Sequence, residues 1–230
     1  LVNLNMIIKY INQRYQFPKR LFKLQCLVNL FNLSSPYQGT ALHCQRPSLN
    51  NLAGKNYNSL SNQCHAEKSN ENIYESTIEV PSEEMMEKLG GLLSYGSLPG
   101  DVILLYGDVG AGKTCLSRGF VRSITDDENK PVTSPSYLLD NTYKSPKGYV
   151  IHHMDLYRLK GSESLHILNI PTIFERDVCL IEWPERLGSI KPEVFLEIFI
   201  ESKDNGSRKV RFVGHGKWWS ETVKNIEKYI

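Results

Sequence analysis

The segment GDVGAGKT, residues 107–114, constrains the fold more than any other part of the chain. It fits the pattern G-x-x-x-x-G-K-[ST], in which glycines allow backbone N–H groups to surround a phosphate group. The continuous apolar run Val102–Tyr106 precedes it and predicts a strand buried on both faces of a sheet. After Lys113 the apolar residues recur at helical spacing, at Leu116, Phe120, Val121 and Ile124. The motif therefore lies between a strand and a helix, as a phosphate-binding loop requires.

Strand and helix patterns continue through the rest of the chain from residue 73. Upstream of the motif, Ser76–Val80 alternates weakly, as an edge strand does, and the sequence PSEE at 81–84 opens a helix. Downstream, strands over Ser136–Tyr143 and Tyr149–Met154 form a hairpin, so we expect mixed pairing in the sheet. The remaining predicted elements are a short helix, a buried strand, a hairpin and a final helix capped by Ser220, at 162–170, 178–181, 194–213 and from 220 onward. These elements predict an α/β fold over residues 73–230, a P-loop NTPase-like three-layer domain with a mixed central sheet.

Charge is unevenly distributed along the 230 residues. Seven of the 27 basic residues precede Glu67, the first acidic residue, which leaves 20 basic against 25 acidic residues in the rest of the chain. An acid-free segment rich in Asn, Ser and Gln is typical of an organelle transit peptide. A disordered tail or an incorrect start site is the alternative, since Leu1 is not Met and Met6 offers another start. We expect residues 1–72 to be a disordered N-terminal extension that directs the chain to a mitochondrial or plastid matrix, with a cytoplasmic location as the alternative.

The glycine-rich segment predicts how a nucleoside triphosphate binds. Gly107, Gly110 and Gly112 permit a tight, partly left-handed path, while Lys113 reaches the β- and γ-phosphates and the Thr114 hydroxyl ligates Mg²⁺. The Asn-Lys-x-Asp element that recognises guanine is absent from the sequence, which favours ATP. No apolar run is long enough to span a membrane. The predicted nucleotide-binding residues are Gly107, Asp108, Val109, Gly110, Ala111, Gly112, Lys113, Thr114, Cys115 and Trp183.

Two carboxylates follow predicted strands at the positions that line the ligand crevice of α/β sheets. Asp155 ends the strand Tyr149–Met154, and Glu182 ends the buried strand 178–181. A P-loop enzyme needs such carboxylates to hold the water shell of the metal and to orient an attacking water. Each is alternatively a solvated carboxylate or a helix cap. We predict Glu182, Asp155 and Lys113 as the catalytic residues.

Other residues near these positions give weaker signals. The loop Ser134–Ser136 offers hydroxyls where nucleotide enzymes place a switch residue on Mg²⁺ or the γ-phosphate, although hydroxyls beside Pro are common in turns. Trp183 either packs over the nucleotide or a partner, or belongs to the core. His152 and His153 point to opposite faces of a strand, so we interpret both as structural.

The sequence resembles the TsaE (YjeE) family of ATPases, which act in bacterial and organellar tRNA threonylcarbamoyladenosine synthesis. Four stretches carry the resemblance, LLYGDVGAGKT at 104–114 with SRGF behind it, VTSPSY at 132–137, HHMDLYRL at 152–159 and CLIEWPERL at 179–187. The resemblance covers about residues 76–215 and implies metal binding and hydrolysis by Asp155 and Glu182. Ser136 stands where the family has Thr and keeps a hydroxyl, so the implied metal ligands are Thr114, Ser136, Asp155 and Glu182. Asn169 replaces a common Gly, and Asn tolerates positive φ well enough to keep the turn.

The resemblance also implies partners. It implies an ATPase that does not itself modify the base but binds TsaD-like and TsaB-like proteins, the complex that transfers threonylcarbamoyl to tRNA, so that tRNA is contacted only indirectly. The acidic character of the chain after residue 66 is consistent with this, since RNA-binding surfaces are basic.

Two other functions fit the phosphate-binding loop. A small-molecule P-loop kinase has a loop and a core of the same kind, but usually adds a mobile lid with several arginines, and the segments after Leu159 and Glu185 offer only Arg176 and Arg186. A non-catalytic ATP-binding adaptor would bind nucleotide without hydrolysing it. Measuring hydrolysis with and without partner proteins distinguishes the adaptor from the ATPase.

Overall fold

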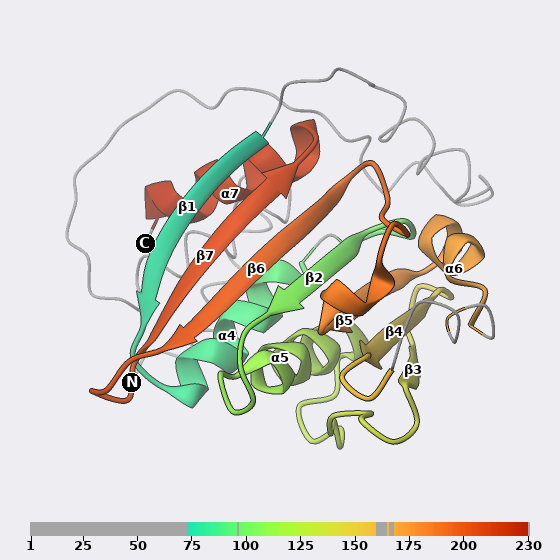
Figure 1. Cartoon of the computed structure of the whole chain (residues 1–230), viewed down its shortest axis with the longest axis horizontal. Helices are drawn as coiled ribbons and strands as arrows, with labels where there is room; N and C mark the ends of the chain where they lie inside the picture. The colour runs from blue at the N-terminus through green and yellow to red at the C-terminus, as the bar shows by residue number, and fades with distance from the viewer. Residues whose placement is uncertain (1–72, 96, 160–164, 166–167, 230) are drawn as a thin grey trace, which may run out of the picture. The chain divides into compact units, whose positions relative to one another are not determined.

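The computed structural model describes residues 73–95, 97–159, 165 and 168–229 (Figure 1). The predicted N-terminal extension, 1–72, lies outside the described residues, as does most of the helix predicted over 162–170. Within the described part of the chain, no helix has both the length and the apolar character needed to cross a lipid bilayer.

The central feature is one seven-stranded mixed sheet with the order β1-β7-β6-β2-β5-β4-β3. Its strands are β1 (Ile73–Val80), β2 (Val102–Tyr106), β3 (Asp140–Lys144), β4 (Val150–Asp155), β5 (Val178–Glu182), β6 (Phe195–Ser202) and β7 (Arg208–His215). Strands β6, β2, β5 and β4 are parallel neighbours, whereas β1, β7 and β3 pair antiparallel at the two sides. The predicted mixed sheet is confirmed, and β1 is an edge strand as its weak alternation indicated.

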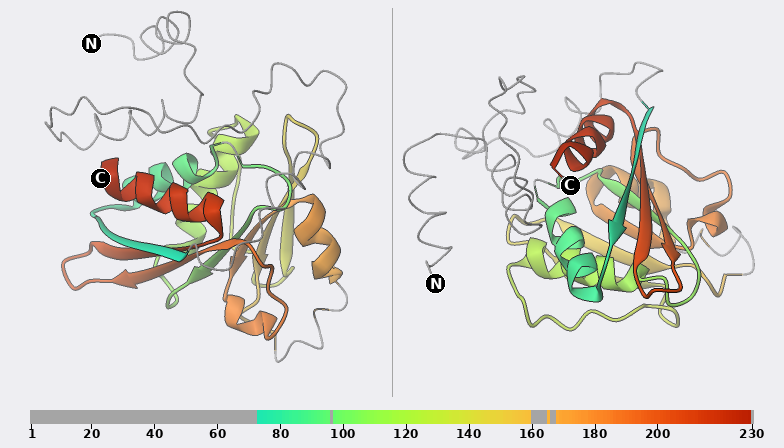
Figure 2. Two further views of the ribbon diagram at one scale, coloured as in Figure 1. Left: turned by 90° about the horizontal axis from the view of Figure 1, so that it is seen from above. Right: turned by 90° about the vertical axis from the view of Figure 1, so that its left-hand side faces the viewer.

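Helices cover both faces of this sheet. Figures 1 and 2 show α4 (Glu83–Leu93), α5 (Lys113–Thr125) and α7 (Lys217–Tyr229) on one face, and α6 (Ile170–Arg176) with the short 3-10 helix η3 (Pro184–Leu187) on the other. The two central strands, β2 and β5, are almost entirely apolar, as expected where both faces of a strand are covered, and every residue of β5 is buried. The predicted three-layer, P-loop NTPase-like fold is therefore confirmed.

Helices α4 and α5 approach each other closely at two glycines. A Cβ atom added to Gly90 of α4 would lie 2.0 Å from the Leu116 carbonyl oxygen, and one added to Gly119 of α5 would lie 1.8 Å from the Glu87 carbonyl oxygen. Glu87 also binds Arg118 and Arg122 of α5, at 2.9 and 3.0 Å. Because the Thr114 side chain starts from α5, this contact fixes where the beginning of α5 lies against the sheet.

Several predicted boundaries are wrong. Strand β3 begins at Asp140 rather than Ser136, because the Leu138 and Leu139 amides both donate to the Pro135 carbonyl and close a turn. The final helix begins at Lys217, directly after Gly216, and Ser220 is not its cap because its amide already donates to Gly216 within the first turn.

The structure has a helix, α6, that begins at Ile170, the last residue of the helix predicted over 162–170. Pro171 occupies its first turn, where the missing N–H of proline costs no helical hydrogen bond. Asn169 precedes it at φ 46°, which confirms that asparagine holds the turn at positive φ.

Candidate functional site

The loop between β2 and α5 has the backbone that a phosphate-binding loop requires. Gly107, Gly110 and Gly112 have φ values of 141°, 81° and 116°, a region that side chains with a Cβ rarely adopt. At Gly107 the restriction is also steric, since a Cβ would lie 2.4 Å from the carbonyl oxygen of Ile200 on β6. Gly112 leads directly into α5, so unpaired amides and the positive end of the helix dipole face the loop.

Lys113 is held inside this loop. Its Nζ donates to the carbonyl oxygens of Gly107 and Asp108, at 2.6 and 2.8 Å, and lies 4.2 Å from the ring centroid of Trp183. Burial lowers the pKa of the ammonium, while the negative charges of Glu182 and Asp155 oppose this shift. The lysine therefore lies within the electrostatic field of both acidic residues.

The two carboxylates lie side by side at the ends of adjacent parallel strands. Asp155 of β4 and Glu182 of β5 are register partners, and each is only 3% exposed. Glu182 is also in register with Leu105 of β2, the strand that leads into the phosphate-binding loop. Among the described residues, neither carboxylate forms a salt bridge with Lys or Arg. Two buried like charges without such a partner make this place favourable for a cation.

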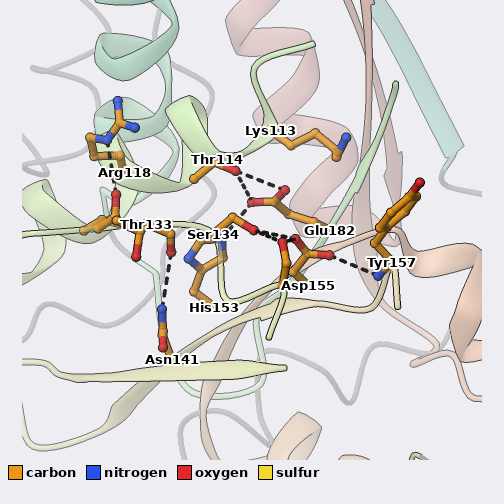
Figure 3. Close-up of polar contacts among 12 residues, drawn as sticks. Lys113, Thr114, Arg118, Thr133, Ser134, Asn141, His153, Asp155, Tyr157 and Glu182 are labelled. Atoms are coloured by element: carbon orange, nitrogen blue, oxygen red, sulfur yellow. Dashed lines mark hydrogen bonds and ion pairs between the residues drawn. The ribbon is translucent and has the colours of Figure 1, made fainter. Parts of the chain in front are cut away.

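Hydroxyl groups orient both carboxylates (Figure 3). Thr114 Oγ1 donates to Glu182, at 2.9 Å from Oε1 and 3.2 Å from Oε2. Ser136 Oγ donates to Asp155 Oδ2 at 2.7 Å, and Ser134 Oγ contacts the same oxygen. The Tyr157 amide donates to Asp155 Oδ1 at 3.0 Å. The four predicted metal ligands therefore form two hydrogen-bonded pairs, Thr114 with Glu182 and Ser136 with Asp155.

These donors suit Mg²⁺ better than a metal held entirely by protein. No group of three or more His, Cys, Asp or Glu side chains that could hold a metal ion occurs in the described part of the chain. Mg²⁺ is usually bound by one or two carboxylates together with phosphate oxygens and waters. Two buried carboxylates and two hydroxyls beside a phosphate-binding loop provide that kind of site.

Not every predicted nucleotide-binding side chain faces the loop. The Cys115 thiol contacts the Glu83 carbonyl oxygen on α4 at 3.3 Å, and burial raises its pKa to about 11, so only its backbone is available to a phosphate. The Val109 side chain is exposed at the tip of the loop. Trp183 is half-buried at φ 60° and its ring lies 4.8 Å from that of Tyr157.

Sequence reasoning assigned no site role to His153. Its Nε2 lies 2.8 Å from Glu182 Oε1, and its side chain is fully buried. Its neighbour His152 contacts Asp140 and Asp177 instead, at 2.7 and 3.6 Å. Strand alternation contained the missing signal, since His153 lies two residues before Asp155 and therefore on the same face of β4.

Comparisons with known proteins agree with this geometry. The family model of "Threonylcarbamoyl adenosine biosynthesis protein TsaE" matches residues 80–210. The tRNA threonylcarbamoyladenosine biosynthesis protein TsaE of Rickettsia conorii is 35% identical over 146 residues, which is 64% of this chain and 82% of that protein. The TsaE protein of Haemophilus influenzae is 37% identical over 132 residues, 55% of this chain and 82% of that protein.

A solved structure shows the same fold. The crystal structure of YdiB from Bacillus subtilis aligns with a TM-score of 0.54 at 24% identity, covering 70% of this chain and 99% of that one. The family-model match over more than half of the chain settles the family. The chain belongs to the TsaE family of tRNA threonylcarbamoyladenosine biosynthesis proteins.

Proposed function

We propose that this chain binds ATP with Mg²⁺ and hydrolyses it, and that this cycle supports threonylcarbamoyladenosine modification of tRNA through a TsaB/TsaD-type complex. The observation that carries the proposal is the placement of Glu182, which is in register with Asp155 and hydrogen-bonded to Thr114 at the start of α5. This places an acidic pair beside a cradle of backbone amides. A triphosphate requires the amides, and its hydrolysis requires carboxylates.

The loop would bind the phosphates through its amides and Lys113. On binding, the lysine would exchange the Gly107 and Asp108 carbonyl oxygens for phosphate oxygens. Mg²⁺, when bound, neutralises charge on the phosphates, and Thr114, Ser136, Asp155 and Glu182 are the residues that would hold it. Glu182 and Asp155 would orient the attacking water, since they are buried carboxylates at the ends of the strands beside the loop.

Exposed apolar side chains around the site support a protein partner. Four of the five large hydrophobic residues that are exposed in the described part of the chain lie on loops that border the site, Val109, Tyr137, Leu138 and Tyr157. We call these four residues the apolar rim. Apolar side chains gathered on one surface are characteristic of contact regions. We assign the rim to TsaD-like and TsaB-like proteins, with tRNA reached only through them, in a mitochondrial or plastid matrix.

Two substitutions test the ATPase. Lys113→Ala should weaken ATP binding by about 10- to 100-fold, the effect of losing a charge-assisted hydrogen bond. Glu182→Gln should keep ATP affinity within about threefold but lower kcat by about 10²- to 10⁴-fold in the presence of TsaD-like and TsaB-like proteins, because general-base assistance is lost. Glu185→Gln is the matched control, since this exposed carboxylate lies three residues away on η3 and should leave kcat unchanged.

The alternatives have distinct outcomes. ATP binding without hydrolysis, with the partner proteins present, would make the chain a non-catalytic adaptor. Transfer of the γ-phosphate to a small molecule would make it a kinase. Normal hydrolysis by Glu182→Gln would exclude the role proposed for Glu182.

A further inference from the structure

The His153 side chain is buried directly beside Glu182. It lies on β4 two residues before Asp155, on the same face of the strand, and its register partner on β5 is Leu180. Figure 3 shows its ring beside Glu182, with Lys113 on the other side of that carboxylate. Because the ring is fully buried, its contact with Glu182 is shielded from water.

The two oxygens of Glu182 are held unequally. Oε1 accepts hydrogen bonds from His153 Nε2 at 2.8 Å and from Thr114 Oγ1 at 2.9 Å. Within the described ranges of the chain, Oε2 has only the longer contact with Thr114, at 3.2 Å. Two donors from different elements, β4 and α5, fix the position of Oε1 and therefore the plane of the carboxylate. Oε2 keeps its capacity to accept a further hydrogen bond or to approach a cation.

We propose that His153 is a positioning residue, which holds Glu182 through Oε1 so that Oε2 faces the reacting water or the metal. This inference rests on the proposed ATPase function. In this role His153 acts through Glu182 and would not itself contact the nucleotide or the water. Residues that orient a ligating or catalytic carboxylate through a hydrogen bond typically change metal affinity or activity by about 10- to 100-fold when they are replaced.

The other ring nitrogen argues against a purely structural role. His153 Nδ1 is buried and has no hydrogen-bond partner in the described part of the chain. A buried polar atom without a partner costs stability, and an apolar side chain of similar size would fill the same space without that cost. His152 is different, because Asp140 and Asp177 lie at its two ring nitrogens. The feature that distinguishes histidine from such an apolar side chain at position 153 is the bond from Nε2 to Glu182.

The experiment replaces the donor and then restores it. His153→Phe fills the space without a donor, and His153→Asn is too short to place its amide at the Nε2 position. His153→Gln places an N–H donor close to that position. His152→Gln is the matched control, on the same strand but with its partners away from Glu182. Full-length proteins are compared by thermal unfolding, by kcat and KM for ATP with the TsaD-like and TsaB-like proteins, and by Mn²⁺ affinity with and without ADP.

We expect loss of the donor to lower kcat while KM hardly changes, and we expect glutamine to restore kcat. The Phe and Asn variants should lose about 10- to 100-fold in kcat, with KM changed by less than about threefold, while the Gln variant and His152→Gln stay within about threefold of the wild type. In a Glu182→Gln background the Asn substitution should have no further effect, because both act through one carboxylate. If the Phe protein does not fold, the Asn and Gln comparison decides.

Other results overturn the inference. Equal kcat for the Asn and Gln variants, or losses that follow the unfolding temperature and include His152→Gln, would assign His153 to folding alone. A wild-type protein without hydrolysis in the presence of partners would refute the ATPase proposal separately. Mn²⁺ affinity then decides on His153, because positioning predicts a loss of about tenfold in the Asn variant and recovery in the Gln variant, and equal affinities contradict it.

Discussion

Two adjacent glycines in α4 should respond to alanine in opposite directions. A Cβ added at Gly90 would lie 2.0 Å from the Leu116 carbonyl oxygen of α5, whereas one added at Gly91 has its nearest neighbour, Ser123 Cβ, at 3.5 Å. Both positions are helical, so both substitutions remove the same backbone freedom from the unfolded chain. The difference between the two variants therefore isolates the contact between α4 and α5.

The magnitudes follow from two opposing effects. Gly→Ala within a helix stabilises by about 1 kcal/mol, which raises the Tm of a domain of this size by about 2 to 4 °C. Overpacking usually costs about 1 to 3 kcal/mol, and we take about 3 at Gly90 because the obstructing atom is a backbone oxygen that cannot rotate away. The net loss for Gly90→Ala is then about 2 kcal/mol, or about 4 to 8 °C in Tm. For Gly91→Ala we expect the full stabilisation of about 1 kcal/mol, because there is no overpacking to oppose it.

Thermal unfolding followed by circular dichroism, at one protein concentration and scan rate, measures both variants. We also expect Gly90→Ala to weaken ATP binding, because α5 must move away from α4 and carries the end of the phosphate-binding loop, with Lys113 and Thr114, with it. A Gly90→Ala protein that melts at or above the temperature of Gly91→Ala would refute the close approach of the two helices.

Two further predictions concern the loop and the sheet. Gly107→Ala should weaken ATP binding by about tenfold or more while the fold persists. The reason is that Gly107 has φ 141° and an added Cβ would lie 2.4 Å from the Ile200 carbonyl oxygen, and such backbone strain costs about 1 to 3 kcal/mol. Unchanged ATP affinity, measured by calorimetry, would contradict this. His152→Gln should lower Tm more at pH 6 than at pH 8. Burial lowers the pKa of His152, but the hydrogen bond and charge of Asp140 outweigh it and raise the pKa above 6.5. The imidazolium therefore stabilises the fold below its unfolded pKa, and this contribution is lost as the pH rises through the folded value. An equal Tm difference at both pH values would show that the charge on His152 does not contribute.

The sequence predicted the parts of the site that depend on patterns within one short stretch of the chain. The phosphate-binding loop has its own residue pattern, and the ends of buried strands are marked by the change from apolar residues to Asp155 and Glu182. Because parallel neighbours end at one edge of a sheet, these positions also implied that the two carboxylates lie together. The roles assigned to these residues remain predictions that the experiments above test.

Features that depend on nonlocal contacts were not predictable in this way. A histidine on a strand carries no local sign of its partner, and the contact between His153 and Glu182 depends on the pairing of β4 with β5. The start of β3 depended on the Pro135 carbonyl, which closes a turn where alternation alone favoured a strand. The close approach at Gly90 depended on where α5 passes, which the helix start at 81–84 does not reveal.

The hydrogen bonds divide the site into two parts with different surroundings. Glu182 lies on β5, between β2 and β4, and is bonded to Thr114 and His153, which all belong to helices and strands packed in the core. Asp155 is bonded to Ser134 and Ser136, in the loop that continues into Tyr137 and Leu138 of the apolar rim. A partner that contacts Tyr137 and Leu138, as proposed above, would therefore act on the orientation of Asp155 through this loop. Regulation of hydrolysis by such a partner should thus depend on Ser134, Ser136 and Asp155, while the position of Glu182 is already set by the fold.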